Sequence, residues 1–155
     1  MENTTNVLTD AGQSIFAMDG INQSRAYWPM ARAAHIDLHM TSMQRVNVLL
    51  MGTDPVIDDA LARLVPTLRQ PVRHWTPADP LELPSPAQSG TMILREVGAL
   101  PRIDQYRLLK WLEVSGGRTQ VVSTTTAPLI ALVEAGAFHD TLYYRLNVVC
   151  VDVTT

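Results

Sequence analysis

The stretch GTMILREVGALP, at residues 90–101, decides the fold of this chain. Its apolar run at residues 92–94 is too short for a buried helix and is bracketed by glycines, so it is predicted to be a short buried strand. The strand ends in a charged pair, Arg95 and Glu96, before the chain turns. In a parallel α/β sheet the last residues of each strand lie at the carboxyl edge, where ligands bind. Arg95 and Glu96 are therefore predicted to lie at a functional edge.

The length and composition of the chain fit one domain of ordinary size. The chain has 155 residues, of which 46% are apolar, enough for a sizeable core. The formal net charge of −3 predicts no direct binding to nucleic acid. No stretch has the pattern of a signal peptide or the length of a membrane span, and the single cysteine, Cys150, cannot form an internal disulfide. These features predict a soluble, cytoplasmic protein without membrane contact.

The chain is predicted to have two parts. Residues 1–23 are expected to be flexible or weakly structured, and residues 24–155 to form one α/β domain, with a parallel sheet and flanking helices in three layers. The predicted helices are residues 24–43, 56–68, 101–114 and 128–135; the predicted strands are residues 46–51, 71–79 (including a turn), 91–94, 119–124 and 147–153. In the helix at residues 101–114, a broad apolar face is expected to contain Ile103, Tyr106, Leu109 and Leu112, with Leu108 and Trp111 adjacent.

Two histidines in the first predicted helix have the spacing of a metal-binding pair. His35 and His39 stand four residues apart and would share one helix face. Zinc-binding helices of this kind have glutamate directly after the first histidine, where this chain has Ile36, and no third ligand is evident. We therefore expect no metal and interpret the pair as a half-exposed polar edge.

The strand at residues 46–51, the turn at 52–55 and the helix at 56–68 form the setting in which a phosphate-binding loop occurs. That loop has the pattern G-x-x-x-x-G-K-[ST]. Its glycines let backbone N–H groups surround the phosphates, and its lysine neutralises them. A match at these residues would predict nucleotide binding.

The residues aligned from Gly52 depart from this pattern. Ile57 stands at the second glycine position and Asp58 at the lysine position, with Asp59 following. Pro55 also removes one N–H group from the loop. Replacing lysine by aspartate reverses an interaction with phosphate of roughly several kcal/mol at intermediate dielectric. We therefore predict that the chain binds no nucleotide in the usual mode and needs no cofactor.

Residues 90–101 and the run LYYRLNVV at residues 142–149 resemble the AAA+ domain of sigma-54-dependent transcription activators. In that family the strand ends in Asp-Glu, where the Asp holds Mg²⁺ and the Glu prepares the attacking water. Arg95 stands at the Asp position, Glu96 is retained, and Thr126 stands at the position of a polar sensor residue. The resemblance implies a degenerate nucleotide site comprising Gly52, Thr53, Asp54, Asp58, Asp59, Arg95, Glu96 and Thr126.

The resemblance also implies an AAA+ / P-loop NTPase-like core, with the lid domain and the sigma-contacting insertion missing. Two arginines of the family reach into the neighbouring subunit's ATP site. His139 stands at the first position and Arg145 retains the second, so an interface is predicted at His139, Tyr143, Tyr144 and Arg145. The alternative for Arg145 is a structural ion pair beneath the sheet, which we favour where no nucleotide is bound. The two tyrosines are interpreted as packing residues.

Three functions follow as hypotheses. The first is a non-catalytic regulator, a pseudo-ATPase that binds a full-length sigma-54-dependent activator, another regulator or a second copy of itself. The second is a residual ATP-binding switch without efficient hydrolysis, because Glu96, Thr126 and Arg145 survive wholly or in part. The third is a different enzyme on the same sheet. It has the least support, because the four histidines are dispersed and Cys150 lies within a predicted strand.

Overall fold

The computed structural model describes residues 45–153, so the predictions for residues 1–23 and 24–43, including His35 and His39, lie outside the described residues. The described part contains five parallel strands in the order β2-β3-β4-β1-β5. The strands are β1 (Val48–Met51), β2 (Val72–Trp75), β3 (Gly90–Leu94), β4 (Thr119–Thr125) and β5 (Val149–Asp152). The helices are α3 (Asp54–Leu64), α4 (Arg102–Ser115), α5 (Leu129–Glu134) and α6 (Asp140–Leu146), with 3-10 turns at Val65–Thr67 and Val97–Ala99.

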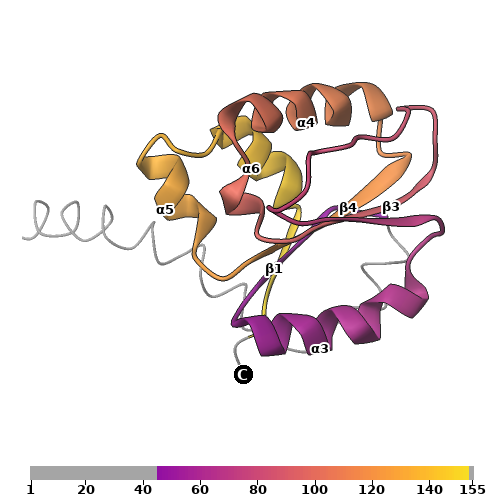
Figure 1. The fold of residues 1–155 in the computed structure, drawn as a ribbon, viewed down its shortest axis with the longest axis horizontal. Coiled ribbons are helices and arrows are strands. Elements are labelled where there is room, and N and C mark those ends of the chain that lie inside the picture. The colour runs from indigo at the N-terminus through magenta and orange to yellow at the C-terminus, as the bar shows by residue number, and fades with distance from the viewer. Residues whose placement is uncertain (1–44, 154–155) are drawn as a thin grey trace, which may run out of the picture. The chain divides into compact units, whose positions relative to one another are not determined.

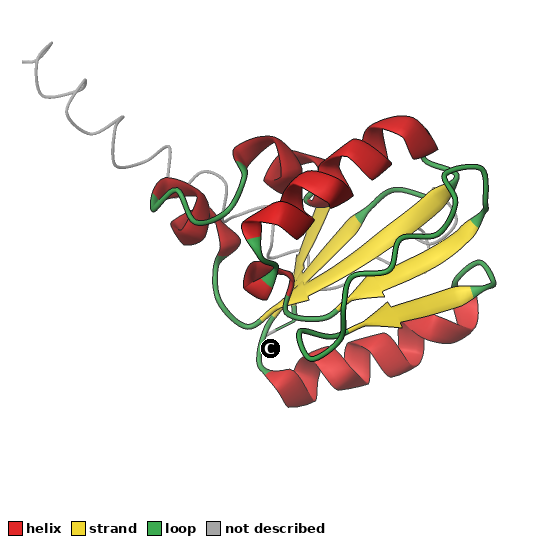
Figure 2. Ribbon diagram, turned by 45° about the horizontal axis from the view of Figure 1, so that its top comes forward, coloured by secondary structure: helices red, strands yellow, loops and turns green. Residues whose placement is uncertain are grey.

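The helices cover both faces of the sheet. Figure 1 shows α3 on one face and α4, α5 and α6 on the other, and Figure 2 shows the same two helical layers from a second angle. Side chains of β1 alternate between the two layers: Val48 and Leu50 pack with α3, whereas Leu49 packs with α4 and α6. Because both faces are covered, β3 and β4 are buried at every position. The predicted three-layer α/β fold is confirmed.

Helix α3 begins and ends earlier than the sequence predicted. It starts at Asp54 instead of residue 56, because Thr53 adopts the extended N-cap conformation and Pro55 fits the first turn, where its missing N–H group is harmless. It ends at Leu64 instead of residue 68, because Pro66 cannot continue an α-helix. The buried stripe has helical spacing and consists of Ile57, Ala60, Leu61 and Leu64.

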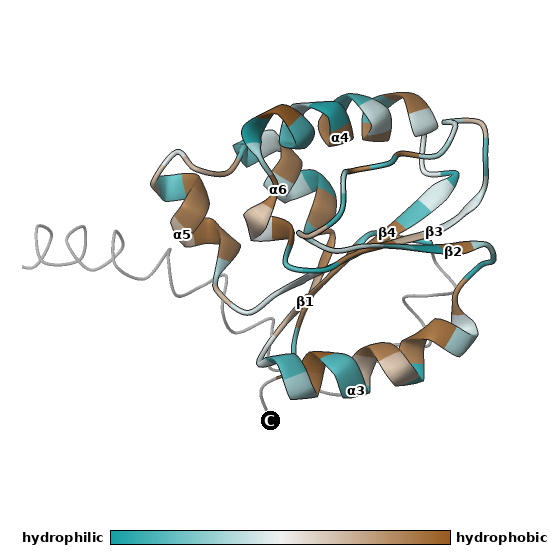
Figure 3. Ribbon diagram, viewed as in Figure 1, coloured by the Kyte–Doolittle hydropathy of each residue, from teal (hydrophilic) through white to brown (hydrophobic). Residues whose placement is uncertain are grey.

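Helix α4 buries only part of the apolar face that was predicted, namely Leu108, Leu109, Trp111 and Leu112. Ile103 and Tyr106 are 67% and 53% exposed, so the prediction that they pack in the core is wrong. At 100° per residue, Ile103 lies about half a turn from Leu112, so the two cannot share a face. The buried face consists of Gln105, Leu108, Leu109, Trp111, Leu112 and Ser115. The alternating colours of α4 in Figure 3 show apolar residues on more than one side of this helix.

The remaining elements lie close to the predicted ranges, with one addition. β4 extends to Thr125, α5 lies within residues 128–135, and β5 lies within residues 147–153. Helix α6 was not predicted as a separate element, although its sequence lies in the run that carries the resemblance. Among the described residues, the connection between β2 and β3 at residues 76–89 contains no helix.

Candidate functional site

Three adjacent strands bring the predicted nucleotide-site residues to one edge of the sheet. The order β3-β4-β1 places the ends of these strands side by side. Arg95 and Glu96 follow β3, Thr126 follows β4, and Gly52 follows β1. The carboxyl edge of a parallel sheet is the usual ligand-binding edge of such folds. The structure therefore brings these four residues to the same edge of the sheet.

The connection from β1 to α3 is too short to surround a phosphate. Only Gly52 and Thr53 lie between the two elements. The N–H groups of Val56 and Ile57 already donate to the carbonyl oxygen of Thr53, at 3.1 and 2.9 Å. Ile57 is a residue of α3 and is fully buried. Its position therefore belongs to the core and not to an open loop. The four-residue turn predicted at residues 52–55 is replaced by the first turn of the helix.

Gly52 is closely packed at the end of β1. Its N–H group donates to the carbonyl oxygen of Thr125 at 3.2 Å. A Cβ atom at this position would lie 2.8 Å from Cγ2 of Val153, closer than side-chain contacts allow. The glycine therefore permits the close approach of β1 and the end of β5. This packing role is independent of any ligand.

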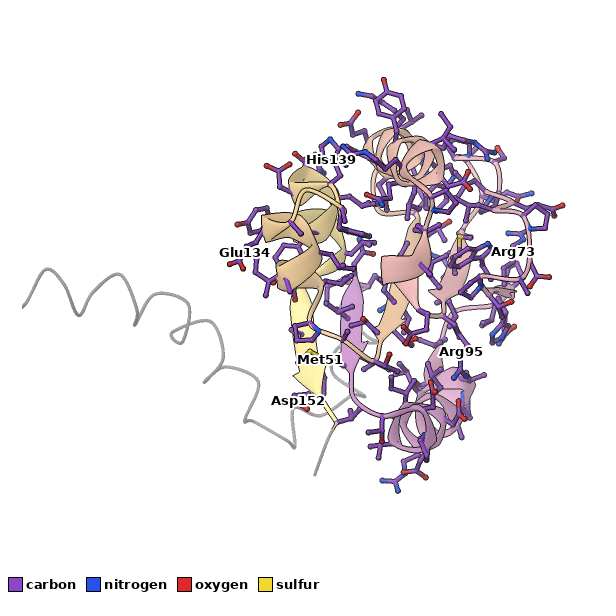
Figure 4. All side chains as sticks on the ribbon, turned by 60° about the vertical axis from the view of Figure 1, so that its left-hand side comes forward. Met51, Arg73, Arg95, Glu134, His139 and Asp152 are labelled. Carbon is purple, nitrogen blue, oxygen red and sulfur yellow. The ribbon has the colours of Figure 1, made fainter. Side chains whose placement is uncertain are left out.

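Arg95 and Asp58 form an ion pair across the edge. Nη1 of Arg95 lies 2.5 Å from Oδ1 of Asp58, with both side chains partly exposed. Figure 4 shows Arg95 close to α3, the helix that carries Asp58. Asp58 and Arg95, which were predicted to stand at the lysine position and at the Mg²⁺-holding position, thus contact each other. The adjacent Asp59 pairs with Arg63 at 2.6 Å on the outer surface of α3.

Glu96 has an unusual backbone and a partly satisfied carboxylate. It adopts the left-handed conformation, with φ 47° and ψ 56°, which is uncommon for a residue other than glycine. Its N–H group donates to Oγ1 of Thr124 at 3.1 Å, and Oγ1 of Thr126 donates to its Oε2 at 3.2 Å. Its other oxygen, Oε1, is buried and has no hydrogen-bond partner within residues 45–153. The Glu96 and Thr126 positions are therefore in direct contact.

Asp54 stands in the first turn of α3, where the helix dipole favours a carboxylate. Together with Asp58 and Asp59, it makes this end of α3 acidic. Two cations contact this group: Arg95 pairs with Asp58, and Arg63 pairs with Asp59.

The predicted interface residues lie on and before α6, away from Arg95. Figure 4 shows His139 among the helices of the opposite face. Tyr144 is 66% exposed, so its interpretation as a packing residue is wrong, whereas Tyr143 is half-buried and contacts the core. The two rings meet edge to face, with centroids 5.2 Å apart. Arg145 is exposed and forms no ion pair with a residue in the described range, so the predicted ion pair beneath the sheet is not found.

His139 has one weak polar contact. Its Nδ1 lies 3.3 Å from Oδ1 of Asp140. That atom is buried and the contact lacks the geometry of a hydrogen bond. The backbone N–H group of His139, in contrast, donates to Oε1 of Gln105 at 2.8 Å. The loop before α6 is therefore held through its backbone and not through the imidazole.

Two buried or half-buried amides at α6 escaped the sequence analysis. Gln105 and Asn47 both bind backbone groups of the segment that contains α6. A signal for Gln105 was available, because it shares the helix face of Leu108, Leu109 and Leu112 and is therefore a polar residue on the buried face. Asn47 lies just before β1, and nothing in its spacing indicates a partner about one hundred residues away.

The chemistry of other sites was also considered. Burial and the nearby Asp152 raise the pKa of the Cys150 thiol, which disfavours the reactive thiolate. Within residues 45–153, no three His, Cys, Asp or Glu side chains are grouped as a metal site requires. No helix in this part of the chain is long and apolar enough to cross a membrane.

The Arg95–Asp58 pair is expected to contribute modestly and measurably to stability. A double-mutant cycle with Arg95→Met and Asp58→Asn should give a coupling free energy of about 0.2–1 kcal/mol, because both groups are partly exposed. The measurement is urea unfolding followed by fluorescence of the buried Trp75 and Trp111. The coupling should fall at high salt. Zero coupling at low salt would contradict the pairing, and the exposed Asp59–Arg63 pair is the matched comparison.

Solved structures with a similar fold include NtrX and a P-loop NTPase domain. NtrX from Brucella abortus is 15% identical, with a TM-score of 0.62 over 94% of this chain and 43% of NtrX. The P-loop NTPase domain of the sigma-54 transport activator from E. coli is 23% identical, with a TM-score of 0.52 over 69% of this chain and 95% of that domain. The described sheet and its helices are therefore an AAA+-type P-loop NTPase fold.

The sequence comparison assigns the family. Residues 34–155 match the family described as Sigma-54 interaction domain, and the chain belongs to that family. The regulatory protein AtoC of Escherichia coli is 34% identical over 74 residues, and the DNA-binding transcriptional regulator NtrC of Rhizobium meliloti is 39% identical over 74 residues. Each match covers 41% of this chain and 15–16% of the relative. The kinship places the chain in the context of transcription regulation.

Proposed function

We propose that this chain is a non-catalytic member of its family, which regulates transcription by binding another protein and not by hydrolysing ATP. Its partner is a complete sigma-54-dependent activator. A second copy of the chain is the other partner to be considered.

The observation that carries this proposal is the short connection from β1 to α3. Nucleotide phosphates need free backbone N–H groups at the start of the helix. Here the N–H groups of Val56 and Ile57 are bound to Thr53, and Ile57 fills the core. A side-chain substitution cannot restore the loop, because the helix itself occupies residues 54–58.

The charges at the edge support the same proposal. Asp58 stands at the lysine position, and the cation nearest to it, Arg95, stands at the position that would hold Mg²⁺. A guanidinium group repels a divalent cation, and a carboxylate repels phosphate. Nucleotide entering this edge would also separate Arg95 from Asp58, so that each side chain would lose the partner of its ion pair. Catalysis by this edge would therefore need both the loop and the charges to change.

The choice of partner rests on kinship and on the exposed side of α6. Tyr144 and Arg145 are exposed on this helix, and Tyr and Arg are enriched among residues that dominate protein interfaces. Family members share the sheet and helices that α6 belongs to. An activator of the same family can therefore offer surfaces that fit this one. Binding would add an inactive copy to the activator or keep its subunits apart.

Two measurements on the purified full chain test the proposal. Calorimetric titration with ATP and Mg²⁺ should show no saturable binding up to millimolar nucleotide, with a complete activator as the positive control. Adding the chain in excess to that activator, from the same organism, should then change its ATPase rate or its assembly state by light scattering. Saturable micromolar ATP binding would contradict the non-catalytic role. An activator with unchanged rate and assembly would contradict the choice of partner.

A residual ATP-binding switch is the second candidate, favoured by one observation. Glu96 and Thr126 remain in contact at 3.2 Å, and Oε1 of Glu96 lacks a partner within the described residues. These positions face the edge at which a γ-phosphate would be sensed. The titration separates the two candidates, because a switch requires saturable binding. Replacing Glu96 by Gln would then be expected to alter the ATP affinity.

A further inference from the structure

Acidic and basic side chains are separated along the strands of the sheet. Acidic residues end or follow four of the strands at the carboxyl edge: Asp54 and Asp58 after β1, Asp79 after β2, Glu96 after β3, and Asp152 at the end of β5. Figure 4 shows Arg95 below Arg73, towards the end of the sheet at which Met51 and Asp152 lie. At the amino edge, arginines begin or precede β2, β4 and β1. They form what we call the basic edge: Arg45, Arg69, Arg73 and Arg118.

Hydrogen bonds fix the backbone of the basic edge. The carbonyl oxygen of Arg69 accepts from Oγ1 of Thr91 at 2.9 Å, which ties the chain before β2 to β3. The carbonyl oxygen of Val46 accepts from Nε2 of Gln120 at 2.7 Å, which ties the chain beside Arg45 to β4. The arginines therefore project from a firm row of strand ends.

The guanidinium groups of the basic edge are available to a ligand. Three of the four arginines are exposed, and Arg73 is half-buried. None of them forms an ion pair with a residue in the range 45–153. Arg45 and Arg69 make no side-chain hydrogen bond in that range either, whereas the other two each donate once, to the side chain of Gln88 and to the carbonyl oxygen of Ser115. The edge therefore carries positive charge that the described residues leave uncompensated.

The net charge of the chain hides this edge, because it is a sum over both ends of the sheet. The formal value is −3. The seven residues of β4 separate the two edges by about 23 Å. Charges are largely screened beyond about 10 Å at 0.1 M salt. The acidic carboxyl edge therefore has little effect on an anion that approaches the basic edge.

The composition of the basic edge fits nucleic acid better than an acidic protein surface. Protein interfaces usually have an apolar or aromatic centre. Among the described residues, no large exposed apolar side chain lies in the segments that form this edge, at residues 45–47, 69–73, 88–90 and 116–119. The edge instead exposes the amides of Gln70 and Gln88 beside the arginines. Arginine and glutamine side chains both contact phosphate oxygens.

We propose that the basic edge binds the phosphate backbone of duplex DNA without reading its sequence. Three strand spacings separate β2 from β1, which is about 14 Å. Duplex DNA carries one charge per about 1.7 Å of its axis, so this length faces about eight phosphates, more than the arginines need. The proposal goes beyond the proposed function, because DNA contact of this kind requires no protein partner.

The test is fluorescence anisotropy of the full chain with a labelled duplex of about two helical turns. Three or four phosphate contacts should give a Kd on the order of 10⁻⁵ M at about 50 mM salt, and the affinity should fall about 40- to 150-fold by about 200 mM. Two duplexes of unrelated sequence should bind alike, because phosphate contacts carry no sequence information. Absence of binding at the lower salt concentration, or binding to one sequence alone, would overturn the proposal.

A double variant, Arg45→Gln with Arg69→Gln, removes two of the contacts. Its stability in urea should equal that of the wild type, because neither side chain has a bonded partner in the described range. Its affinity at about 50 mM salt should fall by at least about 10-fold, and the slope of log affinity against log salt should decrease by about 1.8. Lysine at both positions should restore most of the affinity, since lysine also binds phosphate as a point charge.

Arg107→Gln with Lys110→Gln is the matched control. It lowers the net charge equally, but both residues are exposed on α4 and pair with Asp104 and Glu113. Its affinity should change by no more than about threefold, because the change lies away from the basic edge. Equal losses in the two double variants would mean that net charge alone governs binding, and would overturn the proposal.

Poly-glutamate distinguishes DNA from an acidic protein. As a competitor matched in charge to the duplex, it should displace the labelled DNA only weakly. Displacement at a lower concentration than unlabelled duplex would assign the basic edge to an acidic protein segment and overturn the proposal. These outcomes are independent of the proposed function, whose failure is a chain that leaves the ATPase rate and the assembly of an activator unchanged.

Discussion

Gly90→Ala is expected to lower the free energy of unfolding by about 2–6 kcal/mol. Gly90 begins β3 with φ 144°, a conformation that side chains rarely adopt, and such strain costs about 1–3 kcal/mol. An added Cβ atom would also lie 2.5 Å from the carbonyl oxygen of Pro71, and overpacking of this kind typically costs about 1–3 kcal/mol. That carbonyl accepts a hydrogen bond from Thr91, so it cannot move away freely.

The measurement is urea unfolding followed by fluorescence of Trp75 and Trp111, which are both buried. Gly136→Ala is the control, because Gly136 has φ 70° but no atom within 4 Å of the added Cβ. It should lose only the conformational part, about 1–2 kcal/mol. If both variants lost the same amount, the contact with Pro71 would be irrelevant. A Gly90→Ala chain too unstable to purify would still agree with the expectation, since whole domains are stable by only about 5–15 kcal/mol.

The order of the elements could be predicted because the strands have an unambiguous sequence signal. Runs such as residues 48–51 and 92–94 are apolar at successive positions, as in a strand covered on both faces. Turn residues then separate these runs from helices of ordinary length. The rule that parallel strands end at one edge placed Arg95 and Glu96 there. Gly52 and Thr126 were assigned to the same site through the phosphate-loop pattern and the family resemblance, because strand order cannot be predicted from local sequence.

The orientation of α4 could not be predicted, because apolar residues surround most of this helix. Ile103 is as apolar as Leu108 and Leu109, and Tyr106 has a large aromatic ring, so periodicity allows more than one buried face. Packing decides between them. Trp111 fills the space beside the connection from β2 to β3 and donates to the carbonyl oxygen of Pro84 at 2.7 Å. That contact fixes the rotation of α4 and turns Ile103 outward.

The candidate site shows the same limit. The sequence identified Asp58 and Arg95 as two separate departures from the nucleotide-binding pattern. Their pairing depends on where α3 starts and how it is rotated, which Thr53 and Pro55 determine. Once α3 starts at Asp54, Asp58 lies one turn into the helix and comes within reach of Arg95. The two departures are therefore complementary, because each charge compensates the other.

Leu142→Ala and Tyr144→Ala are expected to separate the stability of α6 from its role in binding. Leu142 is fully buried, and a Leu→Ala change at such a site costs about 2–5 kcal/mol, because a cavity remains. Tyr144 is largely exposed and keeps only the edge-to-face contact with Tyr143, so its loss should cost less than about 1 kcal/mol. Urea unfolding of both variants measures these differences.

Binding to a purified activator should follow a different order from stability. Tyr144→Ala keeps the fold and removes a side chain that the proposed surface presents, so it should weaken binding directly. Leu142→Ala should weaken binding only to the extent that α6 loses its packing, and adding a stabilising osmolyte should recover part of that loss. If the Tyr144→Ala chain regained its binding under the same conditions, the aromatic side chain would act through folding and not through contact with the partner. Unchanged binding by the stable Tyr144→Ala chain would place the contact surface elsewhere on the domain.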